Sequence, residues 1–313
     1  MKKVLILGSG SIAKKHQTIL NQLGFETYLY SEKNRFSQSK NNKLVKFIKN
    51  KDELKNILDN NYFYFALIAN ETFKHFDTIN FCIKYNLNIF CEKPITSLKF
   101  DYKKLSQKII QKKLFFMCNY QLRNLDCILK IKKILKNEKI VSFNMSVGHN
   151  LLSWRKDKLR NESYFINKRK GGGVIFELIH EINLINFIFV NFLKIKTFKR
   201  TFNQNLYCED VAVSIIKMRK NIIGNLYQDM VSPVVFRKLD IICKKNYYEV
   251  DLIKNIITIN KLRKIIFKKT SQINLIKKNL INYINLSKKK PSLKFYEEAV
   301  NDLKIVLKMH DEI

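Results

Sequence analysis

The chain has 313 residues, of which 46% are hydrophobic, and a formal net charge of +33. This composition excludes a disordered chain and supplies enough apolar side chains for two domains with a sizeable core. No apolar run reaches the roughly 18 residues that a membrane-spanning helix needs. The apolar run 4–7 ends at Gly8 and is too short for a secretion signal. We therefore expect a cytoplasmic protein without a membrane span.

The positive charge comes mostly from lysines spread along the whole chain, and arginine, the better ligand for phosphate and guanine, is scarce. A nucleic-acid interface would gather this charge into a patch, so we expect no nucleic-acid partner. Residues 252–296 contain lysines but no acidic residue. This segment is either a solvated basic face or a region that attracts an anionic substrate or a membrane surface.

The six cysteines have no CxxC spacing, and several lie inside apolar runs, where a reduced cysteine behaves as a small hydrophobic residue. We expect no metal site and no disulfide framework.

The first predicted elements are a strand at Lys3–Leu7, a glycine-rich turn and a helix over 14–23. In this context the pattern G-x-G-x-x-A predicts a dinucleotide site. Gly8 would make the tight turn, Gly10 would let the backbone approach a pyrophosphate, and Ala13 would let the helix pack closely on the strand. The turn residues expected at the cofactor are Gly8, Gly10, Ser11, Ile12 and Ala13. An ordinary strand-to-helix turn is the alternative.

The second predicted strand, Glu26–Tyr30, ends where this fold reads the adenosine ribose. Ser31 takes the first position, and Lys33 and Arg35 follow closely, which suits the 2′-phosphate of NADP. Glu32 argues for the ribose diol of NAD. On balance this tip favours NADP.

Three further strands, at 63–69, 88–91 and 114–118, alternate with predicted helices at about 75–85 and up to residue 112. Alternation of this kind predicts a doubly wound parallel sheet, and thus a Rossmann domain over residues 1–119. Asn70 follows a strand with both faces buried, at the edge where such sheets bind ligands, so we expect it at the cofactor.

Three motifs occur in order: 8–16 (GSGSIAKKH), 92–94 (EKP) and 171–174 (GGGV). Together they make the chain similar, over nearly its whole length, to the glucose–fructose oxidoreductase / inositol 2-dehydrogenase (Gfo/Idh/MocA) family. The resemblance implies an α/β fold, with a Rossmann domain followed by an α+β domain that has an open, mostly antiparallel sheet. It also implies NAD(P), with Lys93 beside the nicotinamide and the reacting hydroxyl and Glu92 at the nicotinamide-side ribose.

The chemistry supports this role of Lys93. Removing a hydride from a carbinol leaves a proton to be taken up and an oxyanion to be stabilised, and an ammonium group at the oxygen can help with both. Pro94 would restrict the backbone so that Lys93 is aimed. Without the motif, Lys93 would be one more lysine of a lysine-rich chain.

Residues 120–313 are expected to form a substrate-binding and oligomerisation domain. The predicted elements are a helix at 126–135, strands at 140–147, 210–219, 222–229, 237–243 and 247–252, and a closing helix at Leu293–His310. Residues 256–290 are a Lys/Asn/Ile mixture that fits helix or strand. By analogy with the family we expect a homodimer or homotetramer.

The glycines 171–173 precede a predicted helix over 174–189, and their lack of side chains would let another body, the cofactor and Lys93, come close. Glu177, His180 and Glu181 stand at i, i+3 and i+4, so they share a face of this helix. A glutamate beside an imidazole can fix its tautomer, so we expect His180 to move the proton and Glu177 to orient it. A buried structural histidine is the alternative. The family has Asp where Glu177 stands, and its His four residues later.

Four more residues are candidates for substrate binding. Arg123 could hold a substrate oxygen or phosphate, or it could form an interdomain ion pair. Trp154, Arg155 and Tyr164 lie in a polar stretch that resembles the substrate loop of surface-sugar members of the family. An aromatic ring next to arginine suits a sugar face and an anionic group, but the tryptophan could equally anchor a long loop.

We therefore expect an NAD(P)-dependent oxidoreductase that transfers a hydride to or from a secondary alcohol or ketone of a sugar or sugar derivative. A surface-glycan sugar, anionic or nucleotide-linked, would fit the tryptophan loop and the basic charge. A non-catalytic dinucleotide-binding sensor or scaffold of the same fold is the alternative. The presence of both Lys93 and His180 argues against it.

Overall fold

The computed structural model describes residues 1–32, 43–150, 167, 170–190, 192–203, 206–289 and 292–311. The chain divides into two compact units. The first consists of Met1–Asn119 with Ile276–Asn301, and the second of Tyr120–Leu275 with Asp302–Ile313. The chain thus leaves the first unit at residue 119 and returns to it for 26 residues near its end (301 − 276 + 1).

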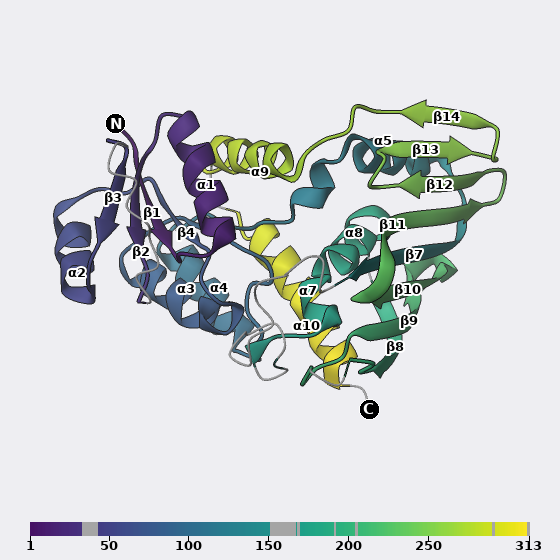
Figure 1. Ribbon diagram of the computed structural model, residues 1–313, viewed down its shortest axis with the longest axis horizontal. Helices are drawn as coiled ribbons and strands as arrows, with labels where there is room; N and C mark the ends of the chain where they lie inside the picture. Colours follow the sequence, from purple (N-terminus) through teal and green to yellow (C-terminus); the bar gives the residue numbers. More distant parts are fainter. Residues whose placement is uncertain are drawn as a thin grey trace. The chain divides into compact units, whose positions relative to one another are not determined.

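The first unit contains a six-stranded parallel sheet (Figure 1). Its strands are β1 (Lys3–Leu7), β2 (Glu26–Tyr30), β3 (Val45–Ile48), β4 (Phe65–Ile68), β5 (Ile89–Cys91) and β6 (Phe116–Cys118). Their spatial order is β3-β2-β1-β4-β5-β6, so the winding direction reverses between β1 and β4. This confirms the doubly wound parallel sheet, and a reversal of this kind is where such sheets bind dinucleotides.

Helices α1 (Ser11–Gln22), α2 (Lys51–Asn60), α3 (His75–Lys84) and α4 (Tyr102–Gln111) connect these strands. β3 and α2 were not predicted from the sequence. Yet α2 has a clear start signal, since the side chain of its N-cap residue Asn50 accepts hydrogen bonds from the N–H groups of Asp52 and Glu53.

One face of this sheet is covered by α1 and by α9 (Gln272–Leu286), which comes from late in the chain. Tyr283 of α9 is fully buried. Its ring contacts those of Phe65, Phe90 and Phe115 at centroid distances of 4.9, 5.0 and 5.3 Å. Part of the uninterpreted stretch 256–290 is therefore a core element of the first unit.

The second unit contains an eight-stranded sheet in the order β14-β13-β12-β11-β7-β10-β9-β8. The bounds are β7 (Ile140–Asn150), β8 (Phe192–Arg200), β9 (Val211–Met218), β10 (Ile223–Asp229), β11 (Val231–Cys243), β12 (Tyr247–Asp251), β13 (Ile256–Ile259) and β14 (Arg263–Ile266). All neighbours pair antiparallel except β7 and β10. The open, mostly antiparallel sheet is confirmed.

The remaining helices are α5 (Asp126–Ile134), α7 (Val174–Glu177), α8 (Ile179–Phe189) and α10 (Lys294–Asp311). Short 3-10 helices lie at η1 (Thr72–Lys74), η2 (Gln121–Asn124), η3 (Leu135–Asn137) and η6 (Arg219–Asn221). In the described part of the chain, no helix is long and apolar enough to cross a membrane.

The helix expected over 174–189 is interrupted. Leu178 has φ −102° and ψ 34°, which separates α7 from α8. The side-chain amide of Gln228 on β10 donates a hydrogen bond to the carbonyl of Leu178 at 2.8 Å. A buried carbonyl at a helix break needs a partner, and Gln228 supplies it from a distant strand.

Candidate functional site

The turn after β1 has the geometry that a bound pyrophosphate requires. Gly8 has φ +135°, and a Cβ at this position would lie 2.3 Å from the carbonyl oxygen of Ala69, so only glycine fits. A Cβ on Gly10 would meet nothing within 4 Å, which leaves space above the turn. Ser11 begins α1, and the N-cap residue Gly10 has no side chain to cap this helix start. Its free N–H groups therefore face that space and suit phosphate oxygens.

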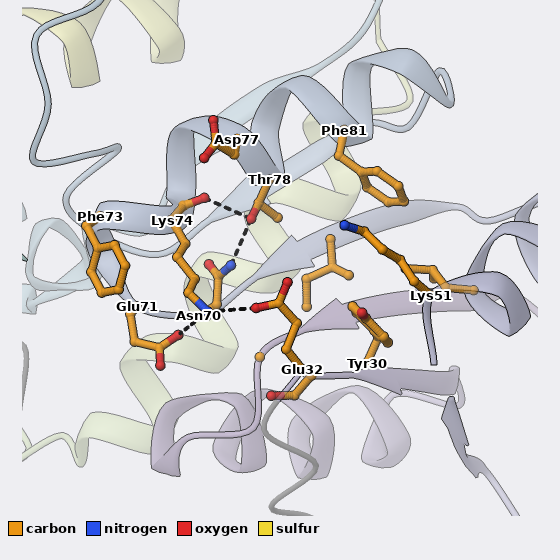
Figure 2. Close-up of a pocket in the computed structure, with 14 residues that line it drawn as sticks. Tyr30, Glu32, Lys51, Asn70, Glu71, Phe73, Lys74, Asp77, Thr78 and Phe81 are labelled. Carbon is orange, nitrogen blue, oxygen red and sulfur yellow. Dashed lines mark hydrogen bonds and ion pairs between the residues drawn. The ribbon is translucent and has the colours of Figure 1, made fainter. Parts of the chain in front are cut away.

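Next to this turn lies a cavity of about 580 Å³ at the carboxyl ends of β1, β2 and β4 (Figure 2). It is lined by Leu7, Gly8, Tyr30, Ser31, Glu32, Lys51, Leu54, Asn70, Glu71, Phe73, Lys74, Asp77, Thr78 and Phe81. The lining combines apolar and aromatic surface with a few polar groups, as small-molecule sites do. Two predicted cofactor residues besides Gly8, namely Ser31 and Asn70, lie in this lining.

Asn70 has an unused acceptor in the cavity wall. Its amide nitrogen donates to the Thr78 hydroxyl at 2.8 Å, while its buried Oδ1 accepts no hydrogen bond from the residues that the structure describes. A buried polar atom without a partner is costly, so a ligand donor at this position would stabilise the arrangement.

At the rim of the cavity, Lys74 and Glu32 form an ion pair at 2.8 Å, and Lys74 also lies 4.0 Å from Glu71 (Figure 2). The hydrogen bond from Lys74 lowers the pKa of the Glu32 carboxyl, and the same bond raises the pKa of Lys74. Glu32 is therefore ionised at neutral pH. Ser31 accepts a hydrogen bond from the Ser9 hydroxyl at 2.9 Å. Lys33 and Arg35 lie outside the described residues.

Glu92 and Lys93 follow β5. In the sheet, β5 lies on one side of β4, and β2, which forms part of the cavity rim, lies on the other side. Glu92 is only 8% exposed. Its Oε1 contacts His16 Nε2 at 2.5 Å and accepts from the Asn119 side chain at 2.7 Å. Burial raises the pKa of the Glu92 carboxyl, but the bonds from His16 and Asn119 outweigh this and hold it below its usual value. Glu92 is thus an ionised group enclosed by protein donors.

In the second unit, Glu177 ends α7 and His180 lies in the first turn of α8, and both are buried. The His180 ring meets the Tyr120 ring edge-on, with centroids 6.2 Å apart. Glu181, beside His180 on α8, forms an ion pair with Arg237 of β11 at 2.7 Å. Glu181 was expected on the helix face of Glu177 and His180, whereas its partner Arg237 was not predicted.

Gly173 has a close neighbour that the sequence did not indicate. Its φ is +105°, and a Cβ here would lie 2.3 Å from the Glu209 carboxylate. The N–H of Val174 donates to the Glu209 carbonyl at 2.9 Å. Within the second unit, the glycine therefore makes room for Glu209.

Arg123 donates from Nε to the Asn183 side chain at 2.6 Å and stacks on the rings of Tyr120 and Phe187. Asn183 in turn donates to Asp302 at 2.5 Å. These partners all belong to the second unit. Trp154, Arg155 and Tyr164 lie outside the described residues. Among the described residues, no cluster of three or more His, Cys, Asp or Glu side chains could hold a metal ion.

The model of an oxidoreductase family with an NAD-binding Rossmann fold, named for Gfo, Idh and MocA, matches residues 2–120. Residues 2–120 belong to the Gfo/Idh/MocA family. This confirms the resemblance seen in the motifs. No curated protein sequence matches the chain.

Solved structures show that the whole chain shares its fold with several dehydrogenases. A UDP-N-acetylglucosamine 3-dehydrogenase from Acidithiobacillus ferrooxidans is 12% identical with a TM-score of 0.77, covering 100% of this chain and 97% of its own. The WlbA dehydrogenase from Bordetella pertussis, in complex with NADH and UDP-GlcNAcA, is 14% identical with a TM-score of 0.81, covering 100% and 96%. Myo-inositol 2-dehydrogenase from Lactobacillus plantarum is 17% identical with a TM-score of 0.80, covering 99% and 96%.

The site residues that were not predicted to take part include Lys74, Lys51 and His16. Lys74 and Lys51 enter the cavity from η1 and α2, where a lysine carries no signal in a lysine-rich chain. His16 did carry a signal, because it is a polar residue on the buried face of α1, between Ala13 and Leu20.

Proposed function

We propose that this protein is an NAD(P)-dependent oxidoreductase acting on a secondary alcohol or ketone of a sugar or sugar derivative. One observation supports this most directly. The open glycine turn and the strand-end cavity of the first unit lie on the same sheet edge as Glu92 and Lys93. A dinucleotide that spans the reversal point would put its adenosine half in the cavity and its nicotinamide half towards β5.

For the adenosine half we propose NAD in preference to NADP. The described lining of the cavity carries three carboxylates (Glu32, Glu71, Asp77) and two ammonium groups (Lys51, Lys74), a net charge of −1 (2 − 3). This balance favours a ribose diol over a 2′-phosphate. The contrary expectation drawn from Lys33 and Arg35 stays a prediction, and titration with NADH and NADPH tests both.

When bound, NAD(P) would accept or supply the hydride. The ammonium group of Lys93 would stabilise the charge that develops on the substrate oxygen, and His180 would take up or return the hydroxyl proton. Glu177 would orient His180. Each of these roles is a proposal that concerns one side chain and can be tested by itself.

For the substrate we propose a sugar derivative with an anionic or nucleotide-linked group. The similar protein from Acidithiobacillus is a UDP-N-acetylglucosamine 3-dehydrogenase, and the one from Bordetella is in complex with UDP-GlcNAcA. The net charge of +33 supports attraction of an anion. Arg123, Trp154, Arg155 and Tyr164 are the proposed contacts.

The test combines binding and turnover. We expect NADH to bind the wild type and to raise its Tm by mass action, and we expect turnover with at least one member of a panel of UDP-sugars, inositols and anhydrosugars. Lys93→Ala and His180→Ala should each lower kcat by about a hundredfold or more while NADH still binds. Lys103→Ala, at an exposed position of α4, is the matched control and should change neither.

A non-catalytic dinucleotide sensor is the second candidate. In that case the wild-type protein would bind NADH but show no turnover with any substrate of the panel. Failure of the wild type to bind NADH or NADPH would contradict both functions.

A further inference from the structure

The short segment Glu92–Pro94, which carries Lys93, is held on both sides by buried histidines from two different helices. On the N-terminal side, His16 of α1 is 0% exposed, and its Nε2 lies 2.5 Å from Glu92 Oε1. Because the pKa of Glu92 is lowered, its carboxylate is an acceptor, so His16 Nε2 carries the hydrogen and donates it.

The Glu92 carboxylate is tied to two more segments. Asn119, directly after β6, donates to Glu92 Oε1 at 2.7 Å, and Asn279 of α9 donates to Asn119 Oδ1 at 2.7 Å. The main chain is fixed as well, since the Glu92 N–H donates to the Ile68 carbonyl at 2.9 Å. Glu92 therefore anchors its end of the segment to elements from across the first unit.

On the C-terminal side, His75 at the start of α3 is 1% exposed and has its Nδ1 at 2.8 Å from the Pro94 carbonyl. Its Nε2 lies 3.2 Å from the Asn70 carbonyl. Burial lowers the pKa of His75, so the ring is neutral and carries one hydrogen. We assign that hydrogen to Nδ1, which makes the shorter contact, so that His75 donates to Pro94.

We propose that His16 and His75 are positioning residues for Lys93, His16 through the Glu92 side chain and His75 through the Pro94 carbonyl. Fixing the backbone on both sides of a lysine leaves only its own side chain to move, which confines its ammonium group to a small volume. This inference rests on the proposed function, because it assumes that Lys93 meets the nicotinamide half of the cofactor.

The cost of the arrangement supports a role beyond packing. An ionised carboxylate and two imidazoles are buried at positions where apolar side chains would pack without desolvating charge. The carboxylate belongs to the segment 92–94, and both imidazoles contact this same segment. Among the described residues, Glu32 and Lys74 of the cavity receive no hydrogen bond from His16 or His75. His75 reaches the cavity lining only at the main-chain carbonyl of Asn70, so the adenosine half should depend little on the two histidines.

This difference gives a direct test with two probes. ADP carries the adenosine half of the cofactor and lacks the nicotinamide half, whereas NADH carries both. We expect His16→Leu and His75→Leu each to raise the Kd of NADH about tenfold, with the Kd of ADP within about twofold of the wild type. His16→Gln keeps a side-chain N–H donor and should restore NADH affinity to within about threefold of the wild type.

Glu92→Gln covers the case in which a leucine variant fails to fold, because it keeps the size of the side chain and removes only the charge. It should weaken NADH and spare ADP in the same way. Equal weakening of both probes in these variants would show a general packing role and overturn the proposal, as would unchanged NADH affinity. Failure of the wild type itself to bind NADH and ADP would instead refute the proposed function, and the proposal with it.

Discussion

The two units place their buried polar groups in different ways. In the first unit, the polar residues of the site follow parallel strands: Ser31 after β2, Asn70 after β4, Glu92 after β5 and Asn119 after β6. In the second unit, the buried polar groups lie on helix and sheet faces, as in the ion pair Glu181–Arg237 and the hydrogen bond from Asn183 to Asp302.

This difference sets what a single amino-acid change should do. Strand ends can give up a side chain with little loss of packing, because the hydrogen bonds of the sheet continue without it. A charge between a helix and a sheet has no such freedom, because its partner is left buried and unpaired. Substitutions of the partly exposed cavity residues of the first unit should therefore affect ligands more than stability, and substitutions of the Glu181–Arg237 pair of the second unit the reverse.

Gly8 should be an exception in the first unit, because its substitution should have a large effect on stability. Gly8→Ala would place a methyl group 2.3 Å from the Ala69 carbonyl at φ +135°. We expect it to lower the free energy of unfolding by about 4 kcal/mol, measured by urea titration. Gly10→Ala is the matched control. Its new Cβ would meet nothing, so the free energy of unfolding should be unchanged while NADH affinity falls. Equal stability of the two variants would contradict this account of Gly8.

Arg237→Met should show the behaviour of the second unit. It removes the cationic partner that the structure records for the carboxylate of Glu181, whose side chain is 0% exposed. We expect a loss of about 3 kcal/mol in the free energy of unfolding. The double variant Glu181→Met/Arg237→Met removes both charges and should recover much of this loss. If the double variant is less stable than the single one, packing and not charge governs the site.

His149 on β7 should make the second unit sensitive to acid. Burial, and then the nearby Arg237, lower the pKa of His149 from 6.5 to about 4. Between these values the unfolded chain binds a proton that the folded chain does not, so stability falls as the pH decreases from 6.5 to about 4. His149→Gln should flatten this part of the Tm-against-pH curve. Parallel curves for wild type and variant would show that His149 does not contribute.

The ion pair between Lys74 and Glu32 should have the smallest effect on stability. The Glu32 side chain is 59% exposed, and exposed pairs contribute about 0.5 kcal/mol. Lys74→Ala should therefore leave the Tm nearly unchanged. It should weaken NADPH about fivefold more than NADH, because it removes a cation from a lining with three carboxylates. This excess should shrink at high salt, and a salt-independent effect would argue against an electrostatic cause.

The sequence predicts the first unit well because its signals are local. The glycine turn at 8–13 follows from a steric rule, and Asn70 lines the cavity because it follows a buried parallel strand. The role of α9 could not be predicted in this way. Ile276, Leu280 and Tyr283 have helical spacing, but nothing in their neighbourhood indicates that they pack on a sheet whose last strand ends at Cys118.

The same limit applies to the second unit. A periodic pattern predicts one helix over 174–189, but the break at Leu178 depends on Gln228, 50 residues away. Likewise, Glu177 and His180 were assigned to one helical face because they are three residues apart, while the structure places them in two helices. Spacing predicts a shared face only where the helix is continuous.

The return of the chain to the first unit has a consequence for biosynthesis. While the protein is being made, Phe65, Phe90 and Phe115 leave the ribosome more than 150 residues before Tyr283, which covers them in the folded unit. A nascent chain cut at residue 119 would present this aromatic surface to water and to chaperones. We expect a fragment that joins residues 1–119 to residues 276–301 through a short linker to be more soluble on expression than residues 1–119 alone.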